Sequence, residues 1–176
     1  KQLIALGAGT ERVAGALRSR FPDVRLALGF ETPLDLLIAL ILAAQCTDER
    51  VNRVTGVLFR KYRTAGDWAQ ADRAVLEEEI RSTGFYRNKA KAIQACTQAL
   101  ADRFGGRVPG KLEELLTLPG VGRKTANILR GNAFGQPAIG VDTHVGRLAR
   151  RLGLTKKKDP DKVEADLVQV VAIGSQ

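Results

Sequence analysis

The residues that most often bind metals or form disulfides are scarce in this chain. It has 2 cysteines, 1 histidine and no methionine among 176 residues. Cys46 and Cys96 both fall inside apolar helical patterns, which predicts neither a disulfide framework nor a metal site. We therefore expect a protein of the reducing cytoplasm that binds no metal. The start at Lys1, without any methionine, leaves open that the gene product is longer.

Long hydrophobic runs are also missing. The longest, residues 34–44, is interrupted by Asp35 and is shorter than the roughly 18 residues that cross a bilayer. The first 20 residues soon turn charged and contain no secretory segment. We expect no membrane segment, and a length of 176 residues that allows one domain or two small lobes.

Acidic residues are outnumbered by basic ones. The sequence contains 28 Lys and Arg against 19 Asp and Glu, a net charge of +9. Such an excess makes a polyanion, nucleic acid above all, the first partner to consider. A basic surface that meets only solvent is the alternative, and charge alone leaves it open.

Alternating strand patterns are absent, and apolar residues recur at helical spacing almost everywhere, so we expect an all-α protein. Thr10, Thr32, Asp48 and Asp72 stand where N-caps are expected. Residues 34–44 are apolar on nearly all sides, which predicts a buried central helix, and "TKKKDP" at 155–160 predicts a hinge between lobes. The expected helices cover residues 10–20, 33–45, 48–62, 73–81, 88–104, 111–116, 123–134, 143–152 and 161–172.

One glycine turn, "LPGVGRK" at 118–124, ends where a helix is expected to begin. Gly120 and Gly122 permit positive φ and close backbone approach, and the N–H groups at a helix start attract anions. A DNA phosphate fits such a site, as in a helix-hairpin-helix that grips the backbone without reading sequence. A plain helical hairpin that needs glycine for its turn explains the turn equally well.

Lys124 and Asp142 follow this turn and are candidate catalytic residues. Lys124 lies in a first helical turn beside Arg123, where the helix dipole and the like charge favour the neutral amine that a nucleophile requires. A phosphate-binding lysine is the alternative. Asp142 precedes a helix that it can cap, and a carboxylate fixed there can also accept a proton or stabilise a developing cation.

These motifs together resemble the endonuclease III family, within the helix-hairpin-helix GPD superfamily of bifunctional DNA glycosylases and AP lyases. The resemblance covers roughly residues 10–170. It rests on "LPGVGRKTAN" followed by "VDTH", on "LILAAQCTDERVN" at 40–52, on "TGFYRNKAKAI" at 83–93 and on "VPGKLEELLTLPGVG".

The resemblance implies roles for individual residues. Lys124 is expected to attack C1′ of a damaged nucleoside, and Asp142 to assist loss of the base and later proton transfers. Gln45 is expected to fill the gap left by the flipped base, with Phe85 as an apolar wedge. The remaining expected DNA contacts are Tyr86, Asn88, Lys89, Gly120, Val121, Gly122, Arg123, His144 and Arg147.

The resemblance also implies an architecture. Residues 31–152 are expected to form a six-helix barrel domain with its hairpin at 112–134, and residues 1–30 and 153–176 to contribute to a smaller second lobe. Most relatives carry a 4Fe-4S cluster on four cysteines near the end of the chain. Because this chain has 2 cysteines, we expect it to hold no cofactor.

The expected function is removal of oxidised pyrimidines from duplex DNA with cleavage of the abasic strand, by a monomer of the bacterial cytoplasm associated with the nucleoid. Two alternatives remain open from the sequence. One is a non-catalytic DNA-binding module that uses only the hairpin, and the other is a glycosylase of the same fold that prefers alkylated bases or a mismatched adenine.

Overall fold

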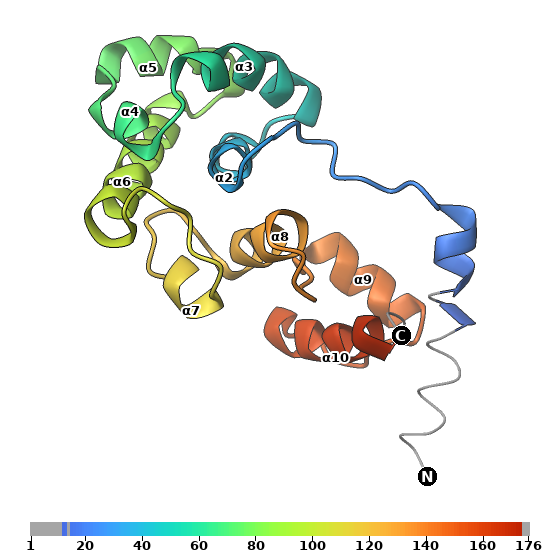
Figure 1. The fold of residues 1–176 in the computed structure, drawn as a ribbon. Coiled ribbons are helices and arrows are strands. Elements are labelled where there is room, and N and C mark those ends of the chain that lie inside the picture. Colours follow the sequence, from blue (N-terminus) through green and yellow to red (C-terminus); the bar gives the residue numbers. More distant parts are fainter. Residues whose placement is uncertain (1–11, 14, 174–176) are drawn as a thin grey trace. The chain divides into compact units, whose positions relative to one another are not determined.

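The computed structural model describes residues 12, 13 and 15–173, and regular structure within them is entirely helical (Figure 1). The all-α prediction is therefore confirmed. The chain folds into two compact units: residues 26–134, called here the larger unit, and residues 1–25 with 135–176, called the smaller unit. The sequence placed the end of the barrel domain at residue 152, whereas the larger unit ends at Phe134; the predicted domain limits stay a prediction.

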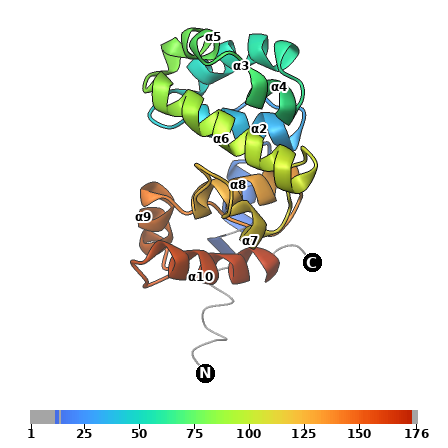
Figure 2. The ribbon, with the colours of Figure 1, turned by 90° about the vertical axis from the view of Figure 1, so that its left-hand side faces the viewer.

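Helix α2 (Pro33–Leu42) is the central helix of the larger unit, as its apolar sequence predicts. Thr32 accepts a hydrogen bond from the Asp35 N–H while the Asp35 carboxylate accepts one from the Thr32 N–H, so the helix starts at a capping box. Leu36, Leu37, Ile38 and Leu42 are all fully buried. Helices α3 (Asp48–Lys61), α6 (Tyr86–Phe104) and α8 (Arg123–Ala133) of the same unit pack against it (Figure 2).

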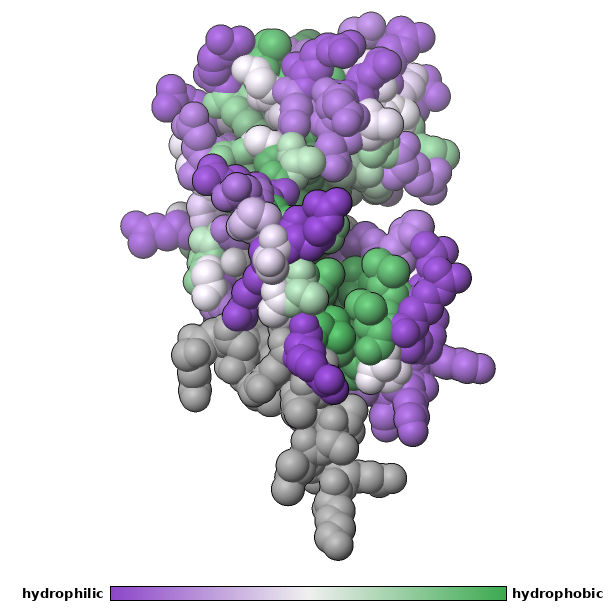
Figure 3. Space-filling model, turned by 90° about the vertical axis from the view of Figure 1, so that its right-hand side faces the viewer, coloured by the Kyte–Doolittle hydropathy of each residue, from purple (hydrophilic) through white to green (hydrophobic). Residues whose placement is uncertain are grey.

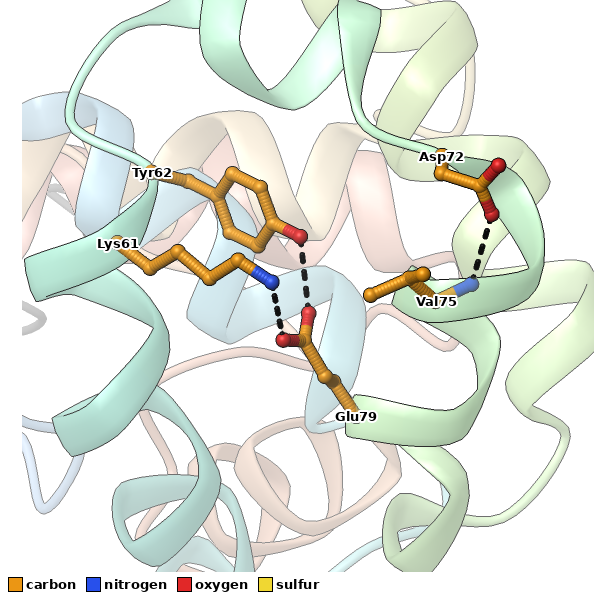
Figure 4. A network of polar contacts seen from close by, with 5 residues as sticks. All are labelled: Lys61, Tyr62, Asp72, Val75 and Glu79. Carbon is orange, nitrogen blue, oxygen red and sulfur yellow. Dashed lines mark hydrogen bonds and ion pairs between the residues drawn. The ribbon is translucent and has the colours of Figure 1, made fainter.

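Helix α3 (Asp48–Lys61) is capped by Thr47, whose hydroxyl accepts from the Arg50 N–H. The sequence assigned this cap to Asp48, which instead lies in the first turn. Beyond α3, the Glu79 carboxylate accepts hydrogen bonds from Lys61 and from the Tyr62 hydroxyl (Figure 4). This pairing ties the end of α3 to helix α5 (Arg73–Glu79), which Asp72 caps as predicted.

Helix α4 (Ala65–Gln70) was not predicted, because its six residues are too few to show a helical period. A second capping box, formed by Thr64 and Asp67, starts it. Its Trp68 side chain is fully buried between the rings of Tyr62 and Phe59. The helix packs along α6 and closes one side of the core.

The short 3-10 helix η1 (Arg81–Thr83) leads into the long helix α6 (Tyr86–Phe104). Helix α6 begins two residues before the predicted Asn88, since Phe85 takes a left-handed conformation and acts as its N-cap residue. It ends at Gly105, with φ of 58°, as the glycine pair predicts. Helices α7 (Leu112–Leu115) and α8 (Arg123–Ala133) complete the larger unit.

In the smaller unit, helices α9 (Thr143–Arg151) and α10 (Pro160–Ile173) pack around Val141, Ala149, Val163 and Leu167. The predicted hinge at 155–160 lies inside this unit and joins α9 to α10. Thr155 is buried there and donates to Asp166 at 2.6 Å, so the segment is anchored.

Residues 12, 13 and 15–20 are helical, whereas the predicted cap Thr10 lies outside the described residues.

Figure 3 shows hydrophilic residues over much of one face of the molecule, together with an apolar patch. Within the described residues, no helix has the length and apolarity that crossing a membrane requires.

Candidate functional site

The glycine turn joins α7 to α8 and is anchored by two buried side chains. Leu118 and Val121 are 3% and 7% exposed, and the Val121 N–H donates to the Leu118 carbonyl at 3.1 Å. Gly120 has φ of 79°, and a Cβ there would lie 3.4 Å from the Cβ of Ala92 on α6. The turn therefore favours glycine at position 120 for its conformation, and lies close against α6.

Helix α8 begins at this turn without a side-chain cap. Its N-cap residue Gly122 is exposed and extended, with φ of −90° and ψ of 172°. An exposed N-terminus of this kind presents backbone N–H groups and the positive end of the helix dipole to an anion. Val121 is buried and anchors the turn. Gly122 and Arg123, in contrast, lie at the N-terminus of α8.

Lys124 is the second residue of α8 and is exposed. The helix is held from its other face, where Ala126 and Leu129 are fully buried in the core. An exposed lysine at the start of a helix that is packed on its other face, next to exposed backbone N–H groups, is suited to act as a nucleophile.

A cleft of about 340 Å³ opens next to the hairpin, entirely within the larger unit. Among its lining residues are Gln45, Phe85, Asn88, Lys89 and Gly120, all of which the sequence analysis singled out. Segments far apart in the chain thus converge at one cleft. Four further lining residues that the sequence analysis did not assign to the site are apolar: Leu40, Ile41, Ala44 and Ala92. Thr125 also lines the cleft, and only its position next to Lys124 could have indicated this from the sequence.

Gln45 and Phe85 share an unusual backbone conformation. Their φ angles are 55° and 48°, and they are the non-glycine residues with positive φ in the described part of the chain. Both side chains are exposed, Phe85 by 63%. An exposed phenylalanine on a strained backbone contributes little to the core, and such strain is typical of functional sites.

The neighbours of Phe85 differ from one another. Tyr86 is half-buried against the core with the Arg87 guanidinium 5.3 Å from its ring centroid, whereas Asn88 is exposed. Lys89 departs from its predicted contact with a phosphate. It is only 5% exposed, and its ammonium donates to the carbonyls of Leu42 and Thr83 at 2.8 and 2.7 Å. We therefore remove it from the DNA contacts.

Asp142, in the smaller unit, caps α9 by accepting a hydrogen bond from the Val145 N–H at 2.9 Å. It is half-buried in a cavity of about 370 Å³ that Arg150 and Lys158 also line. The sequence analysis did not connect these two basic residues with Asp142.

His144 and Arg147 are both exposed on α9. Arg147 Nη2 lies 3.1 Å from His144 Nδ1, so the two side chains contact each other. This geometry agrees with a hydrogen-bonding pair in the first turns of α9, at a surface that a phosphate can approach.

A larger cavity, of about 590 Å³, lies elsewhere in the larger unit and is lined by Asn52, Thr55 and Arg60 among others. It contains none of the predicted site residues, so its size alone does not mark the site.

Metal-binding residues are not clustered: the described residues contain no group of three or more His, Cys, Asp or Glu placed to hold an ion. Cys46 and Cys96, the only cysteines of the sequence, do not supply the four thiolates of a 4Fe-4S cluster.

Comparison with known proteins points to one group. The family model of HhH-GPD superfamily base excision DNA repair proteins matches residues 38–172. Endonuclease III of Synechocystis sp. is 53% identical over 156 residues, which span 88% of this chain and 71% of the relative. Two solved structures, a non-covalent endonuclease III–DNA complex and a trapped endonuclease III–DNA covalent intermediate, each give a TM-score of 0.85 at 44% identity and cover 94% of this chain and 79% of theirs.

Proposed function

Because the chain belongs to the HhH-GPD superfamily of base excision DNA repair proteins, and within it to the endonuclease III family, we propose that it excises oxidised pyrimidines from duplex DNA and cuts the resulting abasic strand. The protein is a DNA glycosylase with AP lyase activity that binds DNA. The observation that carries the finer proposal is the exposed Lys124 at the start of α8, directly after the glycine turn.

Binding begins with the phosphate backbone. The N-terminus of α8 at Gly122 and Arg123 takes one phosphate, and the contacting pair His144 and Arg147 takes another part of the backbone. The net charge of +9 supports such binding and makes it weaken steeply with salt. The hairpin then delivers Lys124 to the sugar of the lesion.

The damaged base leaves the stack before the chemistry starts, at a cost of a few kcal/mol that is lowest for a base already weakened by damage. Gln45 and Phe85 support this step, because both are exposed next to one cleft of the larger unit. Gln45 fills the gap and pairs with the orphaned base, while Phe85 wedges the neighbouring step.

The Lys124 amine attacks C1′, and the glycosidic bond breaks with its electron pair and a proton passing to the departing base. The bound amine loses a proton and the sugar ring opens to give a Schiff base. Loss of a C2′ proton then expels the 3′ phosphate by β-elimination, which cuts the strand 3′ to the lesion. The Asp142 carboxylate, fixed as a cap, stabilises the developing sugar cation and relays protons.

Two further parts of the proposal concern the protein as a whole. We propose a monomer, since the expected catalytic and DNA-contacting residues all come from one chain. We propose a cytoplasmic protein associated with the nucleoid, because Cys46 and Cys96 are both free thiols and the substrate is DNA.

Borohydride trapping tests the nucleophile. The protein is incubated with duplex DNA that contains one abasic site, and sodium borohydride reduces any Schiff base to a stable adduct. We expect the wild type to form the adduct and Lys124→Gln to form none, while duplex binding is kept. Lys111→Gln is the matched control, because Lys111 is an exposed lysine directly before the hairpin, at the N-cap position of α7. Trapping by Lys124→Gln at the wild-type level would overturn the assignment.

A further inference from the structure

Lys89 is a buried lysine whose acceptors are both backbone carbonyl oxygens. Its Nζ donates to Leu42 O at 2.8 Å and to Thr83 O at 2.7 Å, and 5% of the residue is exposed. Burial lowers the pKa of Lys89. A buried ammonium is unfavourable unless hydrogen bonds satisfy it, and the two carbonyls provide such bonds.

The two carbonyls belong to the two segments that carry the inserting residues. Leu42 is the last residue of α2 and stands three residues before Gln45. Thr83 is the last residue of η1 and stands two residues before Phe85. Lys89 itself lies in the first turns of α6, where its N–H donates to the Phe85 carbonyl at 3.1 Å. One side chain therefore connects the α2–α3 loop, residues 43–47, with the entry to α6 at residues 84–85.

Both segments need an external support. Gln45 and Phe85 occupy left-handed φ values, which persist only where the surrounding structure determines them. At the α2 side, the last turn of a helix leaves its carbonyls without intrahelical partners, and a cation is favoured there. The buried Thr83 hydroxyl donates to Ile80 O at 2.8 Å. This bond is local, so it does not connect η1 to α2 as the Lys89 ammonium does.

We propose that Lys89 is a positioning residue that holds these two segments at a fixed separation, so that Gln45 and Phe85 enter the DNA duplex together. Lys89 touches neither the DNA nor the reacting sugar; it acts through the two segments. This inference rests on the proposed function, because it assumes that Gln45 and Phe85 insert into the helix.

The test compares one DNA strand in two forms. A strand with a single abasic site is cut either alone or within a duplex. The single strand has no opposing base and no gap in a duplex for Gln45 and Phe85 to fill. The wild type and Lys89→Met, which keeps a chain of similar length without the donors, are measured under single-turnover conditions. We expect Lys89→Met to lower the duplex rate by about 10- to 100-fold, since small misplacements cost that much, and to change the single-strand rate less than about threefold.

Lys91→Met is the matched control, because it removes the same charge from an exposed position two residues along α6. It is expected to leave the ratio of duplex to single-strand rate unchanged. The proposal is overturned if Lys89→Met leaves the ratio of duplex to single-strand rate unchanged, either because both rates fall equally or because neither rate falls. A wild type that cuts neither substrate overturns the proposed function instead.

Folding is followed by circular dichroism in every variant. If Lys89→Met is unfolded, Lys89→Gln replaces it, because a glutamine keeps an N–H donor for one of the two carbonyls. We expect Lys89→Gln to show a smaller fall of the duplex rate with the single-strand rate kept. A folded Lys89→Gln with an unchanged ratio would overturn the proposal as well.

Discussion

The larger and smaller units differ in how each supports its own candidate site residues. The larger unit builds one continuous core around α2, and residues from α3, α4, α5, α6 and α8 join it. In the smaller unit the described core consists of Val141, Ala149, Val163 and Leu167, while Leu148 on α9 and Leu152, its C-cap residue, stay 50% and 44% exposed. Geometry that must be rigid, such as the glycine turn and the two left-handed residues, lies in the unit with the larger core.

Asp142 shows the other strategy. It is held by a local device, its own cap on α9, rather than by surrounding core. A cap of this kind is worth about 1 kcal/mol and fixes a carboxylate without an extensive core. This chain thus uses tertiary packing to place the two residues proposed to insert, and a local hydrogen bond to fix the carboxylate of Asp142.

The largest expected effect separates the cap from the chemistry at Asp142. Asn caps helices as well as Asp does, so Asp142→Asn is expected to keep α9 and its stability while the single-turnover rate falls by about 10²- to 10⁴-fold. Asp142→Ala is expected to show the same loss of rate and to lose about 1 kcal/mol of stability. Wild-type activity in Asp142→Asn would mean that capping is its only role.

The second prediction tests whether the two units unfold separately. Trp68 is the single tryptophan and is fully buried in the larger unit, so its fluorescence in a urea titration reports on that unit. Leu129→Ala removes a fully buried side chain and is expected to cost about 2–5 kcal/mol, which lowers the Trp68 midpoint. Leu167→Ala, in the smaller unit, is expected to lower the circular dichroism midpoint and leave the Trp68 midpoint unchanged. An equal shift of the Trp68 midpoint by both variants would break the comparison, because it would show that the two units unfold as one.

The smallest expected effect concerns acid and the larger unit. Backbone hydrogen bonds from Thr64 and Arg63 lower the pKa of Asp67 below its ordinary value of 3.8. A carboxyl whose pKa is lower in the folded state contributes stability that is complete above 3.8 and is lost as the pH falls through the lower, folded value. Asp67→Asn is therefore expected to weaken the acid dependence of the Trp68 midpoint below that pH. An unchanged acid limb would show that the Asp67 cap contributes nothing measurable.

Much of the helical structure follows from short-range signals. Pro33 after Thr32 starts α2, Asp72 starts α5, Gly105 ends α6 and Asp142 starts α9, and each of these predictions is confirmed. Errors arose where two local signals competed or where an element was short. Thr47 caps α3 in place of Asp48, and α4 was missed although Thr64 and Asp67 form a capping box.

The sequence by itself determined the helical class, the glycine turn before Lys124, the capping aspartate and the family, because these depend on neighbouring residues and their order along the chain. Only the tertiary structure decided that the segments of Gln45 and Phe85 meet at one cleft, and that Lys89 serves their backbones rather than a phosphate. Leu42 and Lys89 are 47 residues apart. A pattern in the sequence shows that a lysine is present, whereas its burial and its acceptors depend on how distant helices pack.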